Sequence, residues 1–150
     1  AASSSSINDG AAALVMMTES HAKKIGARPI ARIVGHATHA QQPEWFSTAP
    51  VGAVAKLFKK TGWTVKDVDL WEVNEAFAVV PMALMHELDV SHDRVNIHGG
   101  ACALGHPIGA SGARIMVTLI HALKAQGRKR GVATLCIGGG EGTAVALELL

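Results

Sequence analysis

Residues 131–149 read GVATLCIGGGEGTAVALEL, and this stretch decides the fold class. Two apolar runs, Gly131–Ile137 and Thr143–Leu149, flank the glycine-rich segment Gly138–Gly142. Short apolar runs bounded by glycine are typical of buried strands, and a short connection between two strands is typical of an antiparallel hairpin. The sequence therefore predicts two paired strands at the end of the chain.

Strand-like and helix-like segments alternate upstream of this hairpin. We expect strands at Ile30–Ala37, Val68–Val73 and Val95–His98, and helices at Pro50–Lys60, Glu75–Leu88 and Ser111–Ala125. Such alternation indicates an α/β domain with a largely parallel sheet. Together with the hairpin, it predicts a five-stranded mixed sheet with helices on both faces.

Five further local features are expected. We expect a buried strand at Ala11–Thr18 and a short helix at Glu19–Lys24. Asn74 is a plausible N-cap for the helix that follows it, and Pro81 inside that helix predicts a kink. The helical segment Ala113–Leu123 is apolar around most of its circumference, which is typical of a helix buried on several sides.

Composition narrows the class of protein. The chain has 150 residues, of which 49% are hydrophobic, so one domain with a real core is expected. A net charge of +2 does not favour nucleic acid, and no apolar run reaches the roughly 20 residues that span a bilayer. Cys102 and Cys136 are interpreted as thiols. The first residues have no signal-peptide pattern, and without an initial Met we expect a processed chain or part of a longer protein.

The segment Gly99–Gly112, GGACALGHPIGASG, carries the strongest candidate for chemistry. His106 lies among glycines, which let a backbone approach a ligand closely, and just before a predicted helix. A helix N-terminus lowers the pKa of a histidine and favours anions. From these residues alone, a structural and a catalytic role for His106 are equally open.

Rival motifs do not match. A nucleophile elbow needs a second glycine where Ala113 stands, and a phosphate-binding loop needs a lysine that is absent here. The glycines at 138–142 precede a strand, whereas a dinucleotide fingerprint precedes a helix. The spacing of His98, Cys102 and His106 does not favour zinc, because no helix is expected there to align them, so no metal is predicted.

Two further residues stand at element ends. Cys136 ends a predicted strand beside the glycine turn, and Asn74 lies in the run Val73–Phe77, VNEAF. Taken alone, Cys136 is better explained as a small buried apolar residue and Asn74 as a helix cap.

Together, these segments resemble the thiolases. His106 lies in what resembles the family's Gly-His-Pro loop, and Cys136 in its Cys-x-Gly-Gly-Gly signature. Asn74 begins its Asn-Glu-Ala-Phe segment, and Ser5–Ala11 resembles its Ser-x-x-Asn-Asp-Gly-Ala stretch. The match runs from about Ser3 to Glu148, with all four motifs in register.

The resemblance implies an architecture of two similar halves. Each half would have a five-stranded sheet, with a helix from each half buried between the sheets. Residues 1–28 would be the tail end of the N-terminal half, and residues 29–150 the C-terminal domain. The family's nucleophilic cysteine and most of its coenzyme A loop belong to the N-terminal half, and Cys102 does not match the nucleophile's motif. We therefore expect this chain to be inactive alone.

The resemblance also implies residue roles in the complete enzyme. His106 would activate the nucleophile, Cys136 would move the α-proton, Asn74 would hold a water in the enolate's oxyanion hole, and the Gly138 N–H would stabilise the acyl-enzyme oxyanion. The positions that would contact coenzyme A or the acyl group are Ser5, Phe46, Ala76 and Phe77.

The substrates would be coenzyme A thioesters, condensed by Claisen chemistry or cleaved by thiolysis in fatty acid metabolism, with no covalently bound cofactor. The implied partners are the N-terminal half or other subunits in a cytoplasmic homo-oligomer, most simply a homotetramer, without nucleic acid or membrane. Phe46 and Ser3–Ser6 depart from common family patterns and put the acyl chain length in doubt. A non-catalytic partner-stabilising subunit or a degenerate acyl-CoA binder is the alternative.

Overall fold

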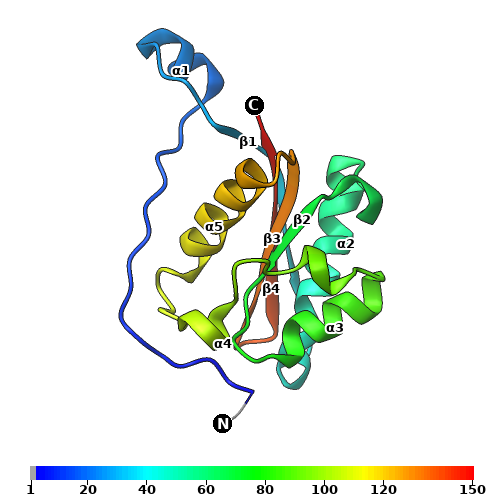
Figure 1. The fold of residues 1–150 in the computed structure, drawn as a ribbon. Helices are drawn as coiled ribbons and strands as arrows, with labels where there is room; N and C mark the ends of the chain where they lie inside the picture. The colour runs from blue at the N-terminus through cyan, green and yellow to red at the C-terminus, as the bar shows by residue number, and fades with distance from the viewer. Residues whose placement is uncertain (1–2) are drawn as a thin grey trace.

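The computed structural model describes residues 3–150 and contains one mixed sheet between two helical layers (Figure 1). The strand order is β1-β4-β3-β2, with β1 at Ala31–Ala40, β2 at Leu70–Val73, β3 at Arg130–Ile137 and β4 at Glu141–Leu149. β2 and β3 are parallel, whereas β4 is antiparallel to both β3 and β1. The α/β class and the terminal hairpin are therefore confirmed.

The sheet has four strands, so the prediction of a fifth at Val95–His98 is wrong. Only a single parallel bridge joins Val95 to Trp71. The next residue, Asn96, has a φ of 49°, which turns the chain out of the extended conformation. Its side-chain amide instead accepts from the Val73 N–H at 2.8 Å and donates to the Val73 carbonyl at 2.8 Å. One side chain thus satisfies the backbone groups that a fifth strand would have paired.

Helices cover both faces of the sheet, as predicted (Figure 1). α5 lies alone on one face, and α2 and α3 lie on the other. The helices are α1 at Glu19–Ile25, α2 at Ala49–Thr61, α3 at Val79–Leu88, α4 at Ala101–Leu104 and α5 at Ser111–Ala125. Short 3-10 turns occupy Pro43–Thr48, Val65–Asp67 and His92–Arg94.

α3 is shorter than the sequence indicated. It begins at Val79 after Ala78, so Asn74 is not its N-cap, and that expectation is wrong. Pro81 accordingly lies in the first turn, where its missing N–H has no intrahelical partner to lose, and no kink is needed. Because Asn74 does not cap α3, its side chain is free to contact the residues of the candidate site.

The expected strand at Ala11–Thr18 is also wrong. This segment is extended but joins no strand of the described chain, and it runs outside α5 up to α1 (Figure 1). Val15 and Met16 are 88% and 67% exposed, while Leu14 packs against the apolar cluster around α5. Apolar residues that were expected to be buried therefore lie open to solvent.

The core is divided by the sheet into two clusters. Leu119 and Leu123 of α5 are fully buried against one face, and Leu57 of α2 and Leu84 of α3 belong to the cluster on the other. Leu119 is so close to β3 that a Cβ on Gly131 would lie 2.7 Å from its Cδ1. Within residues 3–150, no helix combines the length and apolar character needed to cross a membrane.

The approach of α2 to β4 predicts a stability effect. A Cβ added at Gly142 would lie 2.6 Å from the Ala49 carbonyl carbon and 2.8 Å from the Pro50 nitrogen. Because these are backbone atoms at the start of α2, Gly142→Ala should lower the free energy of unfolding by about 1–3 kcal/mol. Urea unfolding followed by circular dichroism measures the change. Gly109→Ala is the control, since its Cβ would meet no atom within 4 Å; equal stability of the two variants would contradict the packing argument.

Candidate active site

Two candidate residues leave the sheet at the same edge. Asn74 follows β2 and Cys136 lies near the end of β3, and these strands are parallel neighbours in which Val73 pairs with Thr134. The Asn74 N–H extends this ladder by donating to the Thr134 carbonyl at 2.9 Å. Ligand sites in α/β folds form beyond the carboxyl ends of strands, so this edge is where a site is expected.

His106 reaches this edge from the loop before α5. The backbone N–H of His106 donates to the Ser6 carbonyl at 2.8 Å, and Gly105 before it has a φ of 94°. The imidazole Nε2 lies 3.3 Å from Asn74 Nδ2, and Nδ1 lies 2.6 Å from Ser111 Oγ. His106 and Asn74, which are 32 positions apart in the sequence, therefore share a direct hydrogen bond.

The surroundings of His106 favour its neutral form. Burial lowers the pKa of the imidazole, and the positive charge of Arg114 lowers it further. The protonated ring loses hydration here and meets a like charge, so the neutral ring prevails at pH 7. A neutral, hydrogen-bonded imidazole in a half-buried site can accept a proton from an incoming group.

Cys136 occupies the other side of the sheet from Asn74. It is 8% exposed and belongs to the cluster that contacts α2 and α3, with Phe46 and Ala76 at the margin of that cluster. Burial raises the pKa of its thiol, so the protonated form is the resting state near neutral pH. Within residues 3–150, no hydrogen bond joins Cys136 to His106 or Asn74.

Gly138 lies in the exposed turn after β3. The Gly140 N–H donates to the Ile137 carbonyl at 3.1 Å and closes the turn, and Gly140 takes a φ of 98° against the backbone of Gln41. A Cβ at Gly138 would meet no atom within 4 Å. The turn is therefore held at Gly140, while Gly138 stands open beside the end of β3.

The four residues expected to contact the substrate form one connected group. Ser5 donates to the Ala76 carbonyl from both its N–H, at 3.1 Å, and its hydroxyl, at 3.0 Å. Phe77 pairs with Ser4 through an isolated bridge and meets the Phe46 ring edge-to-face at a centroid distance of 5.9 Å. The residues before the first helix are thus tied to the segment that follows Asn74.

Sequence reasoning missed two residues that act on this site. Ser111, whose hydroxyl meets His106, is 2% exposed and is the first residue of α5. Its position five residues after His106 in the glycine-rich segment was the available signal. Glu75 was also missed: its carboxylate accepts from Asn96 Nδ2 at 2.8 Å and from the Cys102 N–H at 3.0 Å, which anchors the loop that leads to His106.

A buried ion pair lies beneath Asn74 and His106. Arg114 of α5 approaches Glu72 of β2 at 3.2 Å, and Glu72 is only 2% exposed. Burial raises the pKa of this carboxyl to about 7, although the positive charge of Arg114 opposes the shift. Glu72 therefore ties β2 to α5 two residues before Asn74. Its carboxyl titrates near neutral pH, so the contact with Arg114 is an ion pair above about pH 7 and a hydrogen bond from Arg114 to a neutral carboxyl below it.

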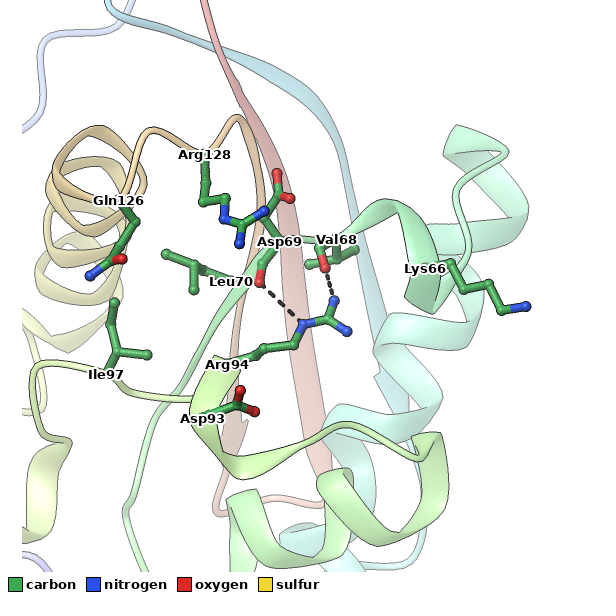
Figure 2. A pocket seen from close by; sticks show the side chains of 9 residues that line it. All are labelled: Lys66, Val68, Asp69, Leu70, Asp93, Arg94, Ile97, Gln126 and Arg128. Atoms are coloured by element: carbon green, nitrogen blue, oxygen red, sulfur yellow. Dashed lines mark hydrogen bonds between the residues drawn. The ribbon is translucent and has the colours of Figure 1, made fainter.

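A hollow of about 520 Å³ lies at the opposite end of the strands, beside Asp69 and the first residue of β2, Leu70 (Figure 2). Two of its charged residues, Arg94 and Asp69, are engaged within the fold. Arg94 donates from Nε to the Asp69 carbonyl at 3.2 Å and also bonds the Val68 carbonyl, as the dashed lines in Figure 2 show. The Asp69 carboxylate accepts from the N–H groups of Lys129 and Arg130. Asp69 thereby stabilises the turn between α5 and β3, and Arg94 stabilises the segment before β2. Because these two side chains have structural roles, this hollow is not the preferred site.

The described residues also bear on metal binding. Among residues 3–150, no three His, Cys, Asp or Glu side chains lie close enough together to hold a metal ion. His106 contacts an amide and a hydroxyl, and the Cys102 sulfur lies 3.8 Å from the carbonyls of Ser3 and Glu75.

Comparison with known proteins gives the family. The sequence model described as "Thiolase, C-terminal domain" matches residues 27–149. This chain belongs to the thiolase family. The matched range begins before β1 and ends with β4, so it includes every strand and the loops that carry Asn74, His106 and Cys136.

Three relatives of this thiolase chain are named as acetyl-CoA acetyltransferases. It is 52% identical over 149 residues to a probable acetyl-CoA acetyltransferase of Dictyostelium discoideum, covering 99% of this chain and 36% of that protein. It is 48% identical over 147 residues to the cytosolic acetyl-CoA acetyltransferase of Mus musculus, covering 98% and 37%. The crystal structure of the Bacillus anthracis acetyl-CoA acetyltransferase is 46% identical, with a TM-score of 0.95 and coverage of 99% and 38%. The thiolase chain thus spans little more than a third of these relatives.

The buried Glu72 predicts a pH dependence of stability for this thiolase chain. Its folded pKa of about 7 lies above the ordinary value of 4.5, so the folded state binds more protons than the unfolded state between these values. The contribution of Glu72 to stability is therefore fully present below pH 4.5 and is lost as the pH rises to about 7.

Relative to Glu72→Gln, wild type should lose on the order of 1–3 kcal/mol between pH 5 and pH 8. Urea unfolding of both proteins at each pH isolates this difference, because their other titrating groups are shared. A stability difference that stays constant with pH would show that Glu72 titrates normally.

Proposed function

We propose that this chain is the C-terminal part of an acetyl-CoA C-acyltransferase that condenses two acyl-CoA thioesters or cleaves 3-ketoacyl-CoA by thiolysis. The observation that carries the proposal is the hydrogen bond between His106 and Asn74, in which a neutral imidazole faces an amide at the carboxyl edge of the sheet. The names of the relatives support the same reaction. Residues 1–28 would complete the N-terminal half of the enzyme, and residues 29–150 would form the C-terminal domain.

The first step would be acylation of a cysteine supplied by the N-terminal half. His106 accepts the proton of that thiol, and the thiolate attacks the thioester carbonyl. The tetrahedral intermediate collapses and the carbon–sulfur bond to coenzyme A breaks. Water would relay the proton of Cys136 to the departing thiolate, so that Cys136 becomes a thiolate and His106 stays protonated. The Gly138 N–H, which stands in an open turn, would donate to the oxyanion of this intermediate.

The second step would need an enolate. Cys136 as a thiolate would remove the α-proton of a second acyl-CoA, and the resulting carbanion would attack the acyl-enzyme carbonyl and release the nucleophilic cysteine. An α-carbon is a far weaker acid than a thiol, so the enolate oxygen requires preorganised donors. In thiolysis the same thiol would return the proton, and the raised pKa of Cys136 keeps that proton in place at neutral pH.

Asn74 and His106 would supply those donors. The Asn74 Oδ1 is buried and accepts no hydrogen bond from residues 3–150, so it can accept one from a water molecule. That water would donate to the enolate oxygen beside the protonated imidazole of His106. Asn74 would therefore hold the water on one side and contact His106 on the other.

The substrate would lie against the group that contains Ser5, Phe46, Ala76 and Phe77. Ser5 supports this role through its link to Ala76, which fixes the segment beside Asn74. Phe77 is 39% exposed and meets Phe46 edge-to-face, so the pair presents an apolar surface suited to an acyl chain. The Ser5 hydroxyl already donates to a carbonyl, so it would offer the pantetheine arm an acceptor.

A second candidate is a non-catalytic subunit that binds acyl-CoA or stabilises a partner. Exposed apolar side chains on the extended N-terminal segment favour partner binding: Ile7, Val15, Met16 and Met17 are 41–88% exposed. Such a segment also offers unpaired backbone groups to another sheet. We propose that its partner is the N-terminal half of the enzyme, in a homo-oligomer in the cytoplasm, the compartment that the name of the mouse relative gives.

The proposed roles separate in the full-length enzyme. Cys136→Ser should slow condensation by about 100-fold or more, because it removes the proton-transfer group, while acylation of the nucleophile stays near wild type. His106→Ala should slow both steps, since it serves both. A burst assay with acetyl-CoA measures acylation, and acetoacetyl-CoA formation measures condensation. Cys102→Ser is the matched control and should keep wild-type rates; wild-type turnover by Cys136→Ser would assign proton transfer to another residue.

The chain of 150 residues should be inactive alone and should associate. It would have no acyl-enzyme cysteine, and its N-terminal segment would leave several apolar side chains in water, each worth about 1.5–3 kcal/mol when buried. Acetoacetyl-CoA thiolysis by the purified chain, its mass by light scattering, and binding of a hydrophobic dye test these statements. Measurable thiolysis would refute the first, and a dilute monomer that binds no dye would refute the second.

A further inference from the structure

We propose that Ser111 is a positioning residue that holds His106 in the tautomer with hydrogen on Nδ1, so that Nε2 alone exchanges protons with the substrate and the nucleophile. The inference rests on the proposed function, because it concerns how His106 performs its two steps. It is carried by a chain of three hydrogen bonds through residues 74, 106, 111 and 107.

The first part of the chain sets the direction of the Ser111 hydroxyl. Ser111 Oγ lies 3.0 Å from the Pro107 carbonyl oxygen, and a carbonyl can only accept. The Pro107 carbonyl also accepts from the backbone N–H groups of Ala110 and Ser111, at 2.8 and 2.9 Å. When the hydroxyl hydrogen points to Pro107, the Ser111 oxygen is left as an acceptor. His106 Nδ1 lies 2.6 Å from that oxygen, and in this arrangement Nδ1 carries the hydrogen.

The other ring nitrogen leads to the same tautomer. Asn74 Nδ2 is a donor and lies 3.3 Å from His106 Nε2. With hydrogen on Nε2, two donors would face each other; with hydrogen on Nδ1, the Nε2 lone pair accepts from the amide. Asn74 is 1% exposed, and its N–H is paired with Thr134, so its position is tightly constrained. The contacts of His106 with Asn74 and with Ser111 therefore favour the same tautomer, with hydrogen on Nδ1.

The charged groups near the imidazole do not determine which ring nitrogen carries the hydrogen. Arg114 is three residues after Ser111 on α5 and is paired with Glu72 of β2. Its charge disfavours the protonated ring as a whole, but it does not select a nitrogen. The Ser111 hydroxyl is the only group among the described residues that hydrogen-bonds Nδ1.

A fixed Nδ1–H explains how one residue serves two steps. Neutral Nε2 accepts the proton of the nucleophilic thiol, and the resulting Nε2–H then donates to the enolate oxygen. Nδ1–H stays bonded to Ser111 throughout, so the ring does not have to turn over between the steps. A ring free to place its hydrogen on Nε2 could not accept the first proton there.

The test measures the pKa of His106 and the turnover of the full-length enzyme in Ser111→Ala and Ser111→Thr. Hydrogen–deuterium exchange at the imidazole C2 position, followed by mass spectrometry across pH, gives the pKa without using activity. Because Ser111 accepts from Nδ1–H and this bond is stronger in the charged ring, Ser111→Ala should lower the pKa of His106 by about one unit. The kcat of thiolysis should fall roughly 10- to 100-fold with little change in KM, and Ser111→Thr, which keeps the hydroxyl, should recover most of both.

The sign of the pKa change decides the proposal. A higher pKa in Ser111→Ala would mean that the hydroxyl donates to Nδ1 and the opposite tautomer is present, and an unchanged pKa would mean that Ser111 only supports the start of α5; either result overturns it. If Ser111→Ala does not fold, ¹⁵N spectra of histidine-labelled wild type identify the protonated nitrogen directly, with His106 assigned by comparison with His106→Asn. A lowered pKa in a protein without thiolase activity would preserve the tautomer and refute the proposed function.

Discussion

Parallel pairing of β2 with β3 is the constraint on which the site depends. Parallel strands end at the same edge, and the Asn74 N–H adds one more rung to their ladder by donating to Thr134. This places Asn74 and Cys136 at neighbouring strand ends. The connection between the two strands contains the loop of His106 and the whole of α5, so the same pairing returns His106 to the edge at which Asn74 stands.

The candidate residues lie on both faces of the sheet. Side chains alternate along β2, so Glu72 meets Arg114 on the face of α5, while Trp71 and Val73 join the core beneath α2 and α3. His106 and Asn74 approach from the α5 side, and Cys136 belongs to the opposite cluster. A reaction that uses all three must therefore take place beyond the strand ends, where both faces are accessible. The raised pKa values of Glu72 and Cys136 and the lowered pKa of His106 all follow from burial at this edge.

Sequence patterns predicted the elements whose signals are local. The hairpin of β3 and β4 follows from two apolar runs around glycine, and the helices at Ser111–Ala125 and near Pro50–Lys60 follow from their sequence patterns. Two predicted strands are absent from the sheet. Val95–His98 has the composition of a strand, but Asn96 satisfies Val73 through its amide. Ala11–Thr18 also has that composition, but no strand among residues 3–150 lies beside it.

The amino-acid sequence alone was sufficient for the α/β class, the family resemblance and the candidates His106, Cys136 and Asn74, because each depends on residue type and spacing along the chain. Tertiary structure alone decided what Asn74 does: it is a hydrogen-bond partner of His106, not a helix cap. It also decided that Ser111 contacts the imidazole and that Glu72 is buried against Arg114. These are properties of distance, burial and donor direction between residues that are separated along the chain, and they exist only once β2, the His106 loop and α5 have come together.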